Sequence, residues 1–337
     1  MSNCKPEDSK ARDRRAEERA KLTAHRGLAT WGERLVPLED FRQAAEGAGR
    51  RLTPDERRRR REEFLNREPD PTPVEGPYSR IAVFGGVYNN HFGLAALLED
   101  AARRGAEAIY CLGDLGGFGP NPEKVRPLLA EGGVRVIQGN YEESLATGHE
   151  DCNCGYTDPR DNHFARISYG YTARGCSDDF KAWMGELPRR RRVRLGEREL
   201  LLVHGSPRRV NEFLFASSSP DPFLEVVLDQ EEADGFLCTH TGLHWHRRLP
   251  SGRDVVNVGV IGRPANDGET HVRYALLEDR GGELGVELLP LVYDHRGLAG
   301  EMRREGLPAE FVETIETGWW TTCLEILPAR ERSASRF

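Results

Sequence analysis

Long hydrophobic runs are missing from this sequence of 337 residues. One of the longest, residues 200–203, reads LLLV, whereas a helix that crosses a bilayer needs about 20 consecutive apolar residues. Residues 1–8, MSNCKPED, also lack the apolar core of a secretory signal. We therefore expect a soluble, cytoplasmic protein that has no membrane partner.

Cysteine is also sparse, and its distribution does not indicate cross-linking. The seven cysteines are an odd number, and without an export signal a disulfide framework is not expected. Cys152 and Cys154 stand close together in an insertion-like stretch, residues 151–163. We expect reduced thiols in general; for this pair, a metal-binding site, a redox pair and a simple loop over the site all remain open.

An excess of positive charge is absent from most of the chain. Residues 78–337 carry 30 Lys and Arg against 39 Asp and Glu, whereas residues 1–77 carry 18 against 16. A globular part with a net charge of −9 repels duplex nucleic acid, so small phosphorylated molecules or nucleotides are the expected partners. We expect a charged extension with a Pro-rich linker over residues 1–77, a main domain over 78–294 and a helical tail over 295–337.

Short apolar runs alternate with segments of helical spacing from residue 79 onward. Predicted strands cover residues 81–84, 108–112, 134–137, 199–203, 235–238, 254–260 and 271–278. The first is followed by a predicted helix over residues 91–104. This alternation is typical of an α/β fold whose site lies at the ends of the strands.

Four of these strands end next to a side chain able to bind a metal ion: Asp114, Asn140, His204 and His240. A carboxylate, an amide oxygen and two imidazoles, with no thiolate, suit a divalent transition metal such as Mn, Fe or Zn. A lone histidine is more often an ordinary core or surface residue. Recurrence after four strands favours one metal ion as the cofactor.

The same residues lie in ordered motifs. Residues 111–122 read CLGDLGGFGPNP, 139–142 GNYE, 202–207 LVHGSP, 239–242 THTG and 256–264 VNVGVIGRP. With these motifs in this order, residues 80–294 resemble the calcineurin-like metallophosphoesterase superfamily, in particular its small bacterial phosphodiesterases and diadenosine-tetraphosphatase relatives. The resemblance implies an α/β two-sheet sandwich flanked by helices, phosphoesterase activity, and metal binding by Asp114, Asn140, His204 and His240.

Four positions depart from the pattern of that superfamily. Gly86 and Tyr88 stand where its first motif has an Asp and a metal-binding His, Tyr141 replaces its catalytic His, and Gly242 replaces a second metal-binding His. The missing ligands serve one metal ion of the superfamily's pair, while the retained ligands serve the other. The resemblance therefore implies a mononuclear centre.

Hydrolysis at a single ion requires other helpers. We expect Tyr88, Tyr141 and His204 to be catalytic, with the two phenols donating a hydrogen bond or a proton to the phosphate ester. The alternative is that the two phenols only fill the space of the lost metal site. The residues expected to bind substrate are Asn90, Arg160, His163 and His244.

Three hypotheses for the function follow. The first is a metal-dependent phosphoesterase that hydrolyses a phosphomonoester or phosphodiester of a small or nucleotide-like molecule. The second is a mononuclear-iron enzyme of another reaction class, since one Asp and two His also suit iron. The third is a phospho-ligand-binding protein without catalysis. The aromatic cluster around Trp319 and Trp320 is expected to pack on the main domain or on a second copy of the chain in a homo-oligomer.

Overall fold

The computed structural model describes residues 29–31, 34–36 and 71–334 and divides the chain into two compact units. The first unit comprises residues 1–70 and 220–232 and contains strand β1 (Ala29–Trp31), its antiparallel partner β2 (Arg34–Val36) and helix α9 (Asp221–Glu231). Most of the expected N-terminal extension lies outside the described residues. The second unit, residues 71–219 and 233–337, holds the sheets and every candidate site residue.

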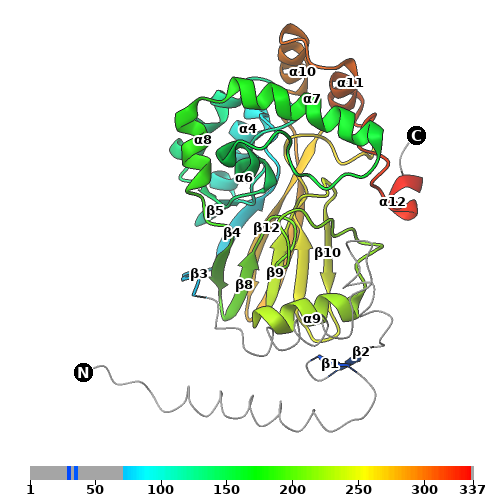
Figure 1. The fold of residues 1–337 in the computed structure, drawn as a ribbon. Helices are drawn as coiled ribbons and strands as arrows, with labels where there is room; N and C mark the ends of the chain where they lie inside the picture. The colour runs from blue at the N-terminus through cyan, green and yellow to red at the C-terminus, as the bar shows by residue number, and fades with distance from the viewer. Residues whose placement is uncertain (1–28, 32–33, 37–70, 335–337) are drawn as a thin grey trace. The chain divides into compact units, whose positions relative to one another are not determined.

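Two sheets form the centre of the second unit (Figure 1). The six-stranded sheet has the order β10 (Trp245–Arg248), β11 (Asp254–Asn257), β9 (Gly235–Cys238), β8 (Arg198–Leu202), β7 (Arg191–Leu195), β3 (Val74–Tyr78). The five-stranded sheet has the order β13 (Glu283–Leu291), β12 (Val272–Arg280), β4 (Arg80–Phe84), β5 (Ala108–Cys111), β6 (Arg135–Val136). Strands β8, β9 and β11 are parallel, as are β4, β5 and β6, so in each group the carboxyl ends meet at one edge.

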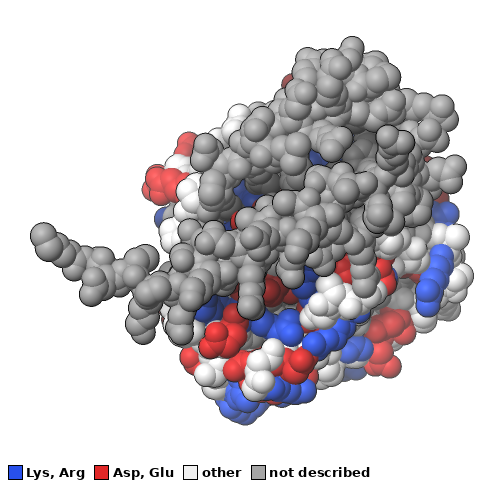
Figure 2. Space-filling model, turned by 90° about the horizontal axis from the view of Figure 1, so that it is seen from below, with Lys and Arg blue, Asp and Glu red and all other residues white. Residues whose placement is uncertain are grey.

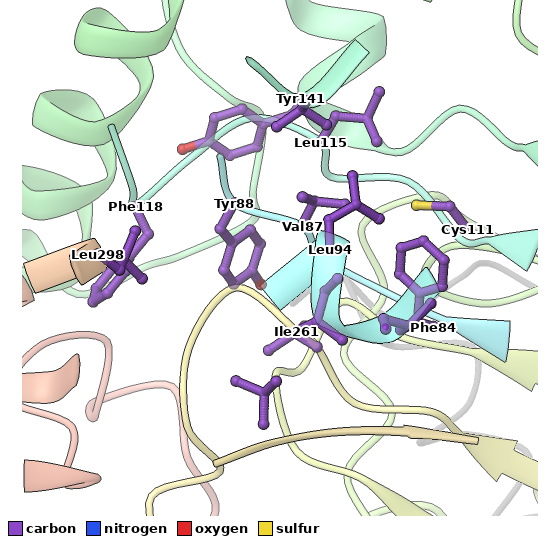
Figure 3. Packing of buried hydrophobic residues seen from close by; sticks show 14 of the residues in the cluster. Phe84, Val87, Tyr88, Leu94, Cys111, Leu115, Phe118, Tyr141, Ile261 and Leu298 are labelled. Atoms are coloured by element: carbon purple, nitrogen blue, oxygen red, sulfur yellow. The ribbon is translucent and has the colours of Figure 1, made fainter. Parts of the chain in front are cut away.

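Alternation along β4 shows how the layers pack. Ile81 and Val83 belong to a buried cluster shared with the six-stranded sheet, while Ala82 and Phe84 belong to a cluster shared with the helices. The helices are α4 (His91–Arg103), the 3₁₀ turn η1 (Pro122–Lys124), α5 (Val125–Glu131), α6 (Asn140–Thr147), α7 (Pro159–Gly175), α8 (Asp178–Gly185), α10 (His295–Arg304), α11 (Ala309–Thr317) and α12 (Ala329–Ser333). Figure 3 shows the rings of Tyr88 and Tyr141 within the helix-side cluster.

The predicted α/β fold with two sheets and flanking helices is confirmed, and so are the tail helices α10 and α11. The Pro-rich stretch up to residue 77 is not wholly a linker, because Val74–Tyr78 forms β3, paired with β7. The long helix α7 was missed within and after the insertion-like stretch. The helix starts at Pro159, and proline is favoured in this first helical position. Asp158 is the N-cap, and its side chain accepts a hydrogen bond from the backbone N–H of Arg160.

Lys and Arg side chains are intermixed with Asp and Glu over the described surface seen in Figure 2. Ion pairs such as Arg280 with Glu287, and Arg80 with Glu278, join opposite charges on β12, β13 and β4. No helix among the described residues is long and apolar enough to span a bilayer.

Candidate metal centre

Loops at the strand ends bring the predicted ligands together. Asp114 follows β5, His204 follows β8 and His240 follows β9, and their ligand atoms all lie within 4.8 Å of one another. All three side chains are buried. Asn140 begins α6 just after β6, and the next backbone N–H, that of Tyr141, donates to Asp114 Oδ1 at 3.3 Å. The carboxyl edges of the two sheets thus supply the cluster, as the sequence predicted.

Two glycines allow these loops to approach each other. A Cβ on Gly113 would lie 2.5 Å from the backbone nitrogen of Gly139, and a Cβ on Gly139 would lie 2.8 Å from His204 Nδ1. Because real Cβ atoms do not come so close, only glycine fits at either position. The glycines beside Asp114 and Asn140 are therefore a requirement of the site's geometry.

Backbone carbonyls fix both imidazole rings. His204 Nδ1 lies 2.6 Å from the Leu112 carbonyl, and His240 Nε2 lies 3.1 Å from the Cys154 carbonyl. Because a carbonyl only accepts, each of these nitrogens carries the hydrogen in a neutral ring. The lone pairs are left on His204 Nε2 and His240 Nδ1, which lie 3.1 Å apart, with Asp114 Oδ2 3.4 Å from His204 Nε2. Orientation of ligand histidines by such carbonyls is typical of metal sites.

Without a cation, this cluster must share protons. Burial lowers the pKa of His204, but the Asp114 carboxylate and the Leu112 carbonyl outweigh it, so the net shift is upward. The pKa of Asp114 is lowered, since attraction to His204 outweighs the effect of burial. Burial and the neighbouring His204 lower the pKa of His240 to about 3. A positive charge bound between these acceptor atoms would stabilise their close approach.

Asn140 supplies a fourth acceptor. Its Nδ2 donates to the Cys152 carbonyl at 2.8 Å and lies 3.3 Å from Cys154 Sγ. Its Oδ1 is buried and receives no hydrogen bond from any described residue. An orphaned buried oxygen costs about 1–3 kcal/mol, and a metal ion would remove that cost. The residues present therefore fit one divalent ion.

Cys152 and Cys154, whose carbonyls contact the side chains of Asn140 and His240, are joined by a disulfide. The expectation of reduced thiols, or of a metal-binding pair, is therefore wrong at these positions. The disulfide fits the redox-pair alternative, and the contacts of Cys152 and Cys154 with Asn140 and His240 fit the alternative of a loop over the site. Cys111, Cys176, Cys238 and Cys323 are free and buried.

Glu142, the last residue of the GNYE motif, is also a site residue. Its Oε2 accepts from the backbone N–H groups of Asp114 and Gly139, both at 2.8 Å, and its Oε1 accepts from that of Leu115 at 2.7 Å. The side chain is fully buried. It joins the loop that carries Asp114 to the start of the helix that carries Asn140.

A small pocket of about 50 Å³ lies beside Asp114 and His240. It is lined by Tyr88, Asp114, Gly117, Phe118, Tyr141, Cys154, Tyr156, Phe164, Ala165, Ser168, His240, Arg263, Phe311 and Cys323. Of these, Cys154 and Tyr156 are partly exposed to solvent and the others are buried. The lining is strained, because five non-glycine residues have positive φ: Tyr88, Asp114, Phe118, His240 and Cys323. Such backbone outliers cost roughly 1–3 kcal/mol each and cluster at functional sites.

Comparisons with known proteins decide the family. The sequence profile of the calcineurin-like phosphoesterase superfamily domain matches residues 80–280. The chain belongs to the calcineurin-like phosphoesterase superfamily. The resemblance to this superfamily that the strand-end motifs indicated is confirmed.

Individual proteins that are similar to this chain share less than a quarter of its residues in the matched regions. An uncharacterised protein of Methanocaldococcus jannaschii is 22% identical over 254 residues, which are 71% of this chain and 98% of that protein. A metallophosphoesterase structure from Sphaerobacter thermophilus is 23% identical with a TM-score of 0.55, over 71% of this chain and 99% of that one. A hypothetical protein from Pyrococcus horikoshii is 24% identical with a TM-score of 0.60, over 72% and 99%. These likenesses show the fold.

Side chains fill the space at the departures from the superfamily pattern. A Cβ on Gly86 would lie 2.9 Å from the Tyr88 ring, so the phenol takes the space of a side chain at position 86. A Cβ on Gly242 would lie 2.9 Å from the Trp320 ring and 3.2 Å from an Arg263 Nη atom. Two of the four departures, Gly86 and Tyr88, are thus coupled by packing, and Trp320 and Arg263 fill the space beside Gly242.

None of the four residues expected to bind substrate lines the pocket. Asn90 is fully buried: its Oδ1 caps α4 at Gly93, and its Nδ2 donates to the Ile261 carbonyl at 2.8 Å. Arg160 is exposed and donates to the Thr321 carbonyl, and His163 is exposed beside Phe164. His244 is half-buried, with its pKa lowered to about 4 by burial and by Arg273. The placement of Asn90 corrects its expected role, because both polar atoms of its buried side chain are engaged. Substrate contacts of Arg160, His163 and His244 stay predictions.

Proposed function

We propose that this protein is a metal-dependent phosphoesterase that uses one divalent transition metal ion. Asp114, Asn140, His204 and His240 would hold the ion. The observation that carries the proposal is the convergence of three buried acceptors: two imidazole nitrogens 3.1 Å apart and the Asp114 carboxylate. The orphaned, buried Asn140 Oδ1 at the start of α6 supports it. Membership of the phosphoesterase superfamily supports the reaction class.

When bound, a divalent ion supplies Lewis-acid activation of a phosphoryl oxygen and of the attacking water. In the reaction, the water oxygen bonds to phosphorus and the ester P–O bond breaks. The water releases a proton and the leaving oxygen gains one. Mn, Fe and Zn all suit this oxygen and nitrogen donor set.

Tyr141 and Tyr88 are the proposed donors to the ester. Burial, together with the charge of Asp114, raises the pKa of both phenols, so each keeps its proton at neutral pH. Tyr141 Oη lies 3.0 Å from Ser168 Oγ, which accepts from the Phe118 N–H at 2.7 Å. The Phe118 N–H therefore holds the hydroxyl pair in place, and Tyr141 lines the same pocket as Asp114 and His240.

A second candidate has one specific observation in its favour. Asp114 with His204 and His240 is a set of two histidines and one carboxylate, which also occurs in mononuclear iron enzymes. Under this alternative, only iron would support turnover, and the reaction would not be ester hydrolysis.

The test is hydrolysis of p-nitrophenyl phosphate and bis(p-nitrophenyl) phosphate by protein loaded in turn with Mn, Fe or Zn. We expect at least one ion to support turnover, a chelator to remove it, and Asp114→Asn to abolish it. Asp151→Asn, at an exposed position on the neighbouring loop, is the matched control and should retain it. Turnover that survives in chelated Asp114→Asn protein would contradict the proposal. Metal and phosphate binding without turnover of either ester would favour a binding protein.

A further inference from the structure

Arg263 is a buried cation without a carboxylate partner. Its side chain is only 5% exposed, and no Asp or Glu among the described residues forms an ion pair with it. Its Nε is buried and donates no hydrogen bond within the described part of the chain. Its other polar contacts are a side-chain hydrogen bond with Cys323 and the nearby Tyr88 and Tyr156. None of these is a carboxylate, and a buried charge is expensive unless it is paired with an opposite one, so an anionic ligand would stabilise this arginine.

The arginine is held firmly in place. Its guanidinium lies 3.5 Å from the centroid of the Trp320 ring, a close cation–π contact. Trp320 is fully buried and is itself fixed, because its Nε1 donates to the Pro264 carbonyl at 2.7 Å and its backbone N–H donates to Asn266 Oδ1 at 2.8 Å. The tail and the segment after β11 thus build one rigid platform for the guanidinium.

The platform lies where the superfamily pattern has a metal ligand that this chain lacks. An Arg263 Nη atom would be 3.2 Å from a Cβ at Gly242, and the guanidinium carbon lies 6.0 Å from the centroid of the Tyr88 ring. Arg263, Tyr88 and Tyr141 line the same pocket as Asp114 and His240. A fixed positive charge therefore lines the same pocket as two of the candidate metal ligands.

We propose that Arg263 binds the phosphoryl group of the substrate, in place of a second metal ion, and that this group is a terminal one. This inference rests on the proposed phosphoesterase function and names its substrate class. The planar guanidinium matches two phosphoryl oxygens at once. The cavity of about 50 Å³ has room for a phosphoryl group. Because its lining residues other than Cys154 and Tyr156 are buried, a single substituent would have to leave past these two.

The experiment is calorimetric titration of the metal-loaded protein with inorganic phosphate and with dimethyl phosphate, alongside metal analysis of the same samples. We expect phosphate to bind, and Arg263→Met to weaken binding about 10- to 100-fold, as for loss of a charge-assisted hydrogen bond. The metal content should remain that of the wild type. Arg174→Met, which removes an exposed arginine at the end of α7, should bind phosphate normally. Dimethyl phosphate, with two substituents, should bind at least about tenfold more weakly than phosphate.

A second variant guards against misfolding. If Arg263→Met does not fold, Arg263→Lys keeps the charge but loses the planar fork, and it should still weaken phosphate binding with metal retained. Unchanged phosphate affinity in a folded, metal-loaded Arg263 variant would overturn the inference, as would wild-type protein that binds no phosphate. Equal affinity for dimethyl phosphate would overturn the terminal-group assignment. Phosphate binding without ester turnover would instead contradict the proposed phosphoesterase function and support phosphate binding at Arg263.

Discussion

Tyr141 stands where the superfamily has a catalytic histidine, and the replacement changes the chemistry available at that position. A histidine titrates near neutral pH, whereas burial raises the pKa of this phenol, so it donates but does not act as a base near pH 7. Its hydroxyl is positioned by Ser168 at 3.0 Å. A proton donor of this kind matters most when the leaving group is poor.

Tyr141→Phe should therefore lower kcat by about 100-fold for an alkyl phosphate such as glycerol phosphate, the lower range for loss of a general acid. For p-nitrophenyl phosphate the effect should be much smaller, because that leaving group departs without a proton. Tyr169→Phe is the matched control, since Tyr169 packs edge-on against Tyr141 but donates its hydroxyl to the His149 carbonyl. Equal losses of kcat for both esters would show that Tyr141 only fills space.

Prediction from sequence succeeded for residues whose position follows from local pattern. Asp114, His204 and His240 each follow a buried strand and stand beside glycine, and the parallel strands carry them to one edge. Arg263 could not be recognised in this way, because its surroundings depend on Trp320, which comes from the distant tail. Asn90 was misjudged because a helix cap and a substrate ligand have the same appearance in sequence.

At the scale of elements, one buried carboxylate ties helix α4 to strand β12. Asp100 Oδ2 accepts from Tyr274 Oη at 2.6 Å and from Arg104 Nε at 2.8 Å. Burial raises the pKa of Asp100, but these hydrogen bonds outweigh it and the net shift is downward. The ionised carboxylate is thus more stable in the folded chain than in the unfolded one.

Asp100→Asn should lower the free energy of unfolding by about 1–3 kcal/mol at pH 7. Because the folded pKa lies below the unfolded value of about 3.9, the stabilisation is complete above that value and is lost as the pH falls through the folded pKa. Urea unfolding at pH 7, 5 and 3 should show a constant difference between wild type and variant at the two higher values and a smaller one at pH 3. Glu99→Gln, at the exposed neighbouring position, should have little effect. A difference independent of pH throughout would contradict the assignment.

Elements were predicted best where an apolar period is uninterrupted. Strands β4, β5 and β9 and helices α4 and α11 have such periods, and their positions agree with the sequence pattern. Helix α7 starts in a segment rich in Asp, Pro and Asn, whose composition is typical of a loop. Strand β3 contains Pro77 at the edge of its sheet, where a missing N–H costs little.

At the scale of the whole molecule, the site depends on parts of the chain that are far apart in sequence. The five-stranded sheet supplies Asp114 and the six-stranded sheet supplies His204 and His240. The tail adds Phe311 and Cys323 to the pocket and Trp320 beneath Arg263. The tail cluster packs on the main domain, which was one of the two arrangements expected for it.

The central claim is that the chain keeps one metal site and has replaced the other with side chains. The most direct test is the metal content of protein purified without added metal or chelator, measured by mass spectrometry for wild type, His240→Ala and the exposed control His163→Ala. We predict about one transition metal ion per chain in wild type and control, and none in His240→Ala. Two ions per chain in the wild type, or one ion retained in His240→Ala, would contradict the account.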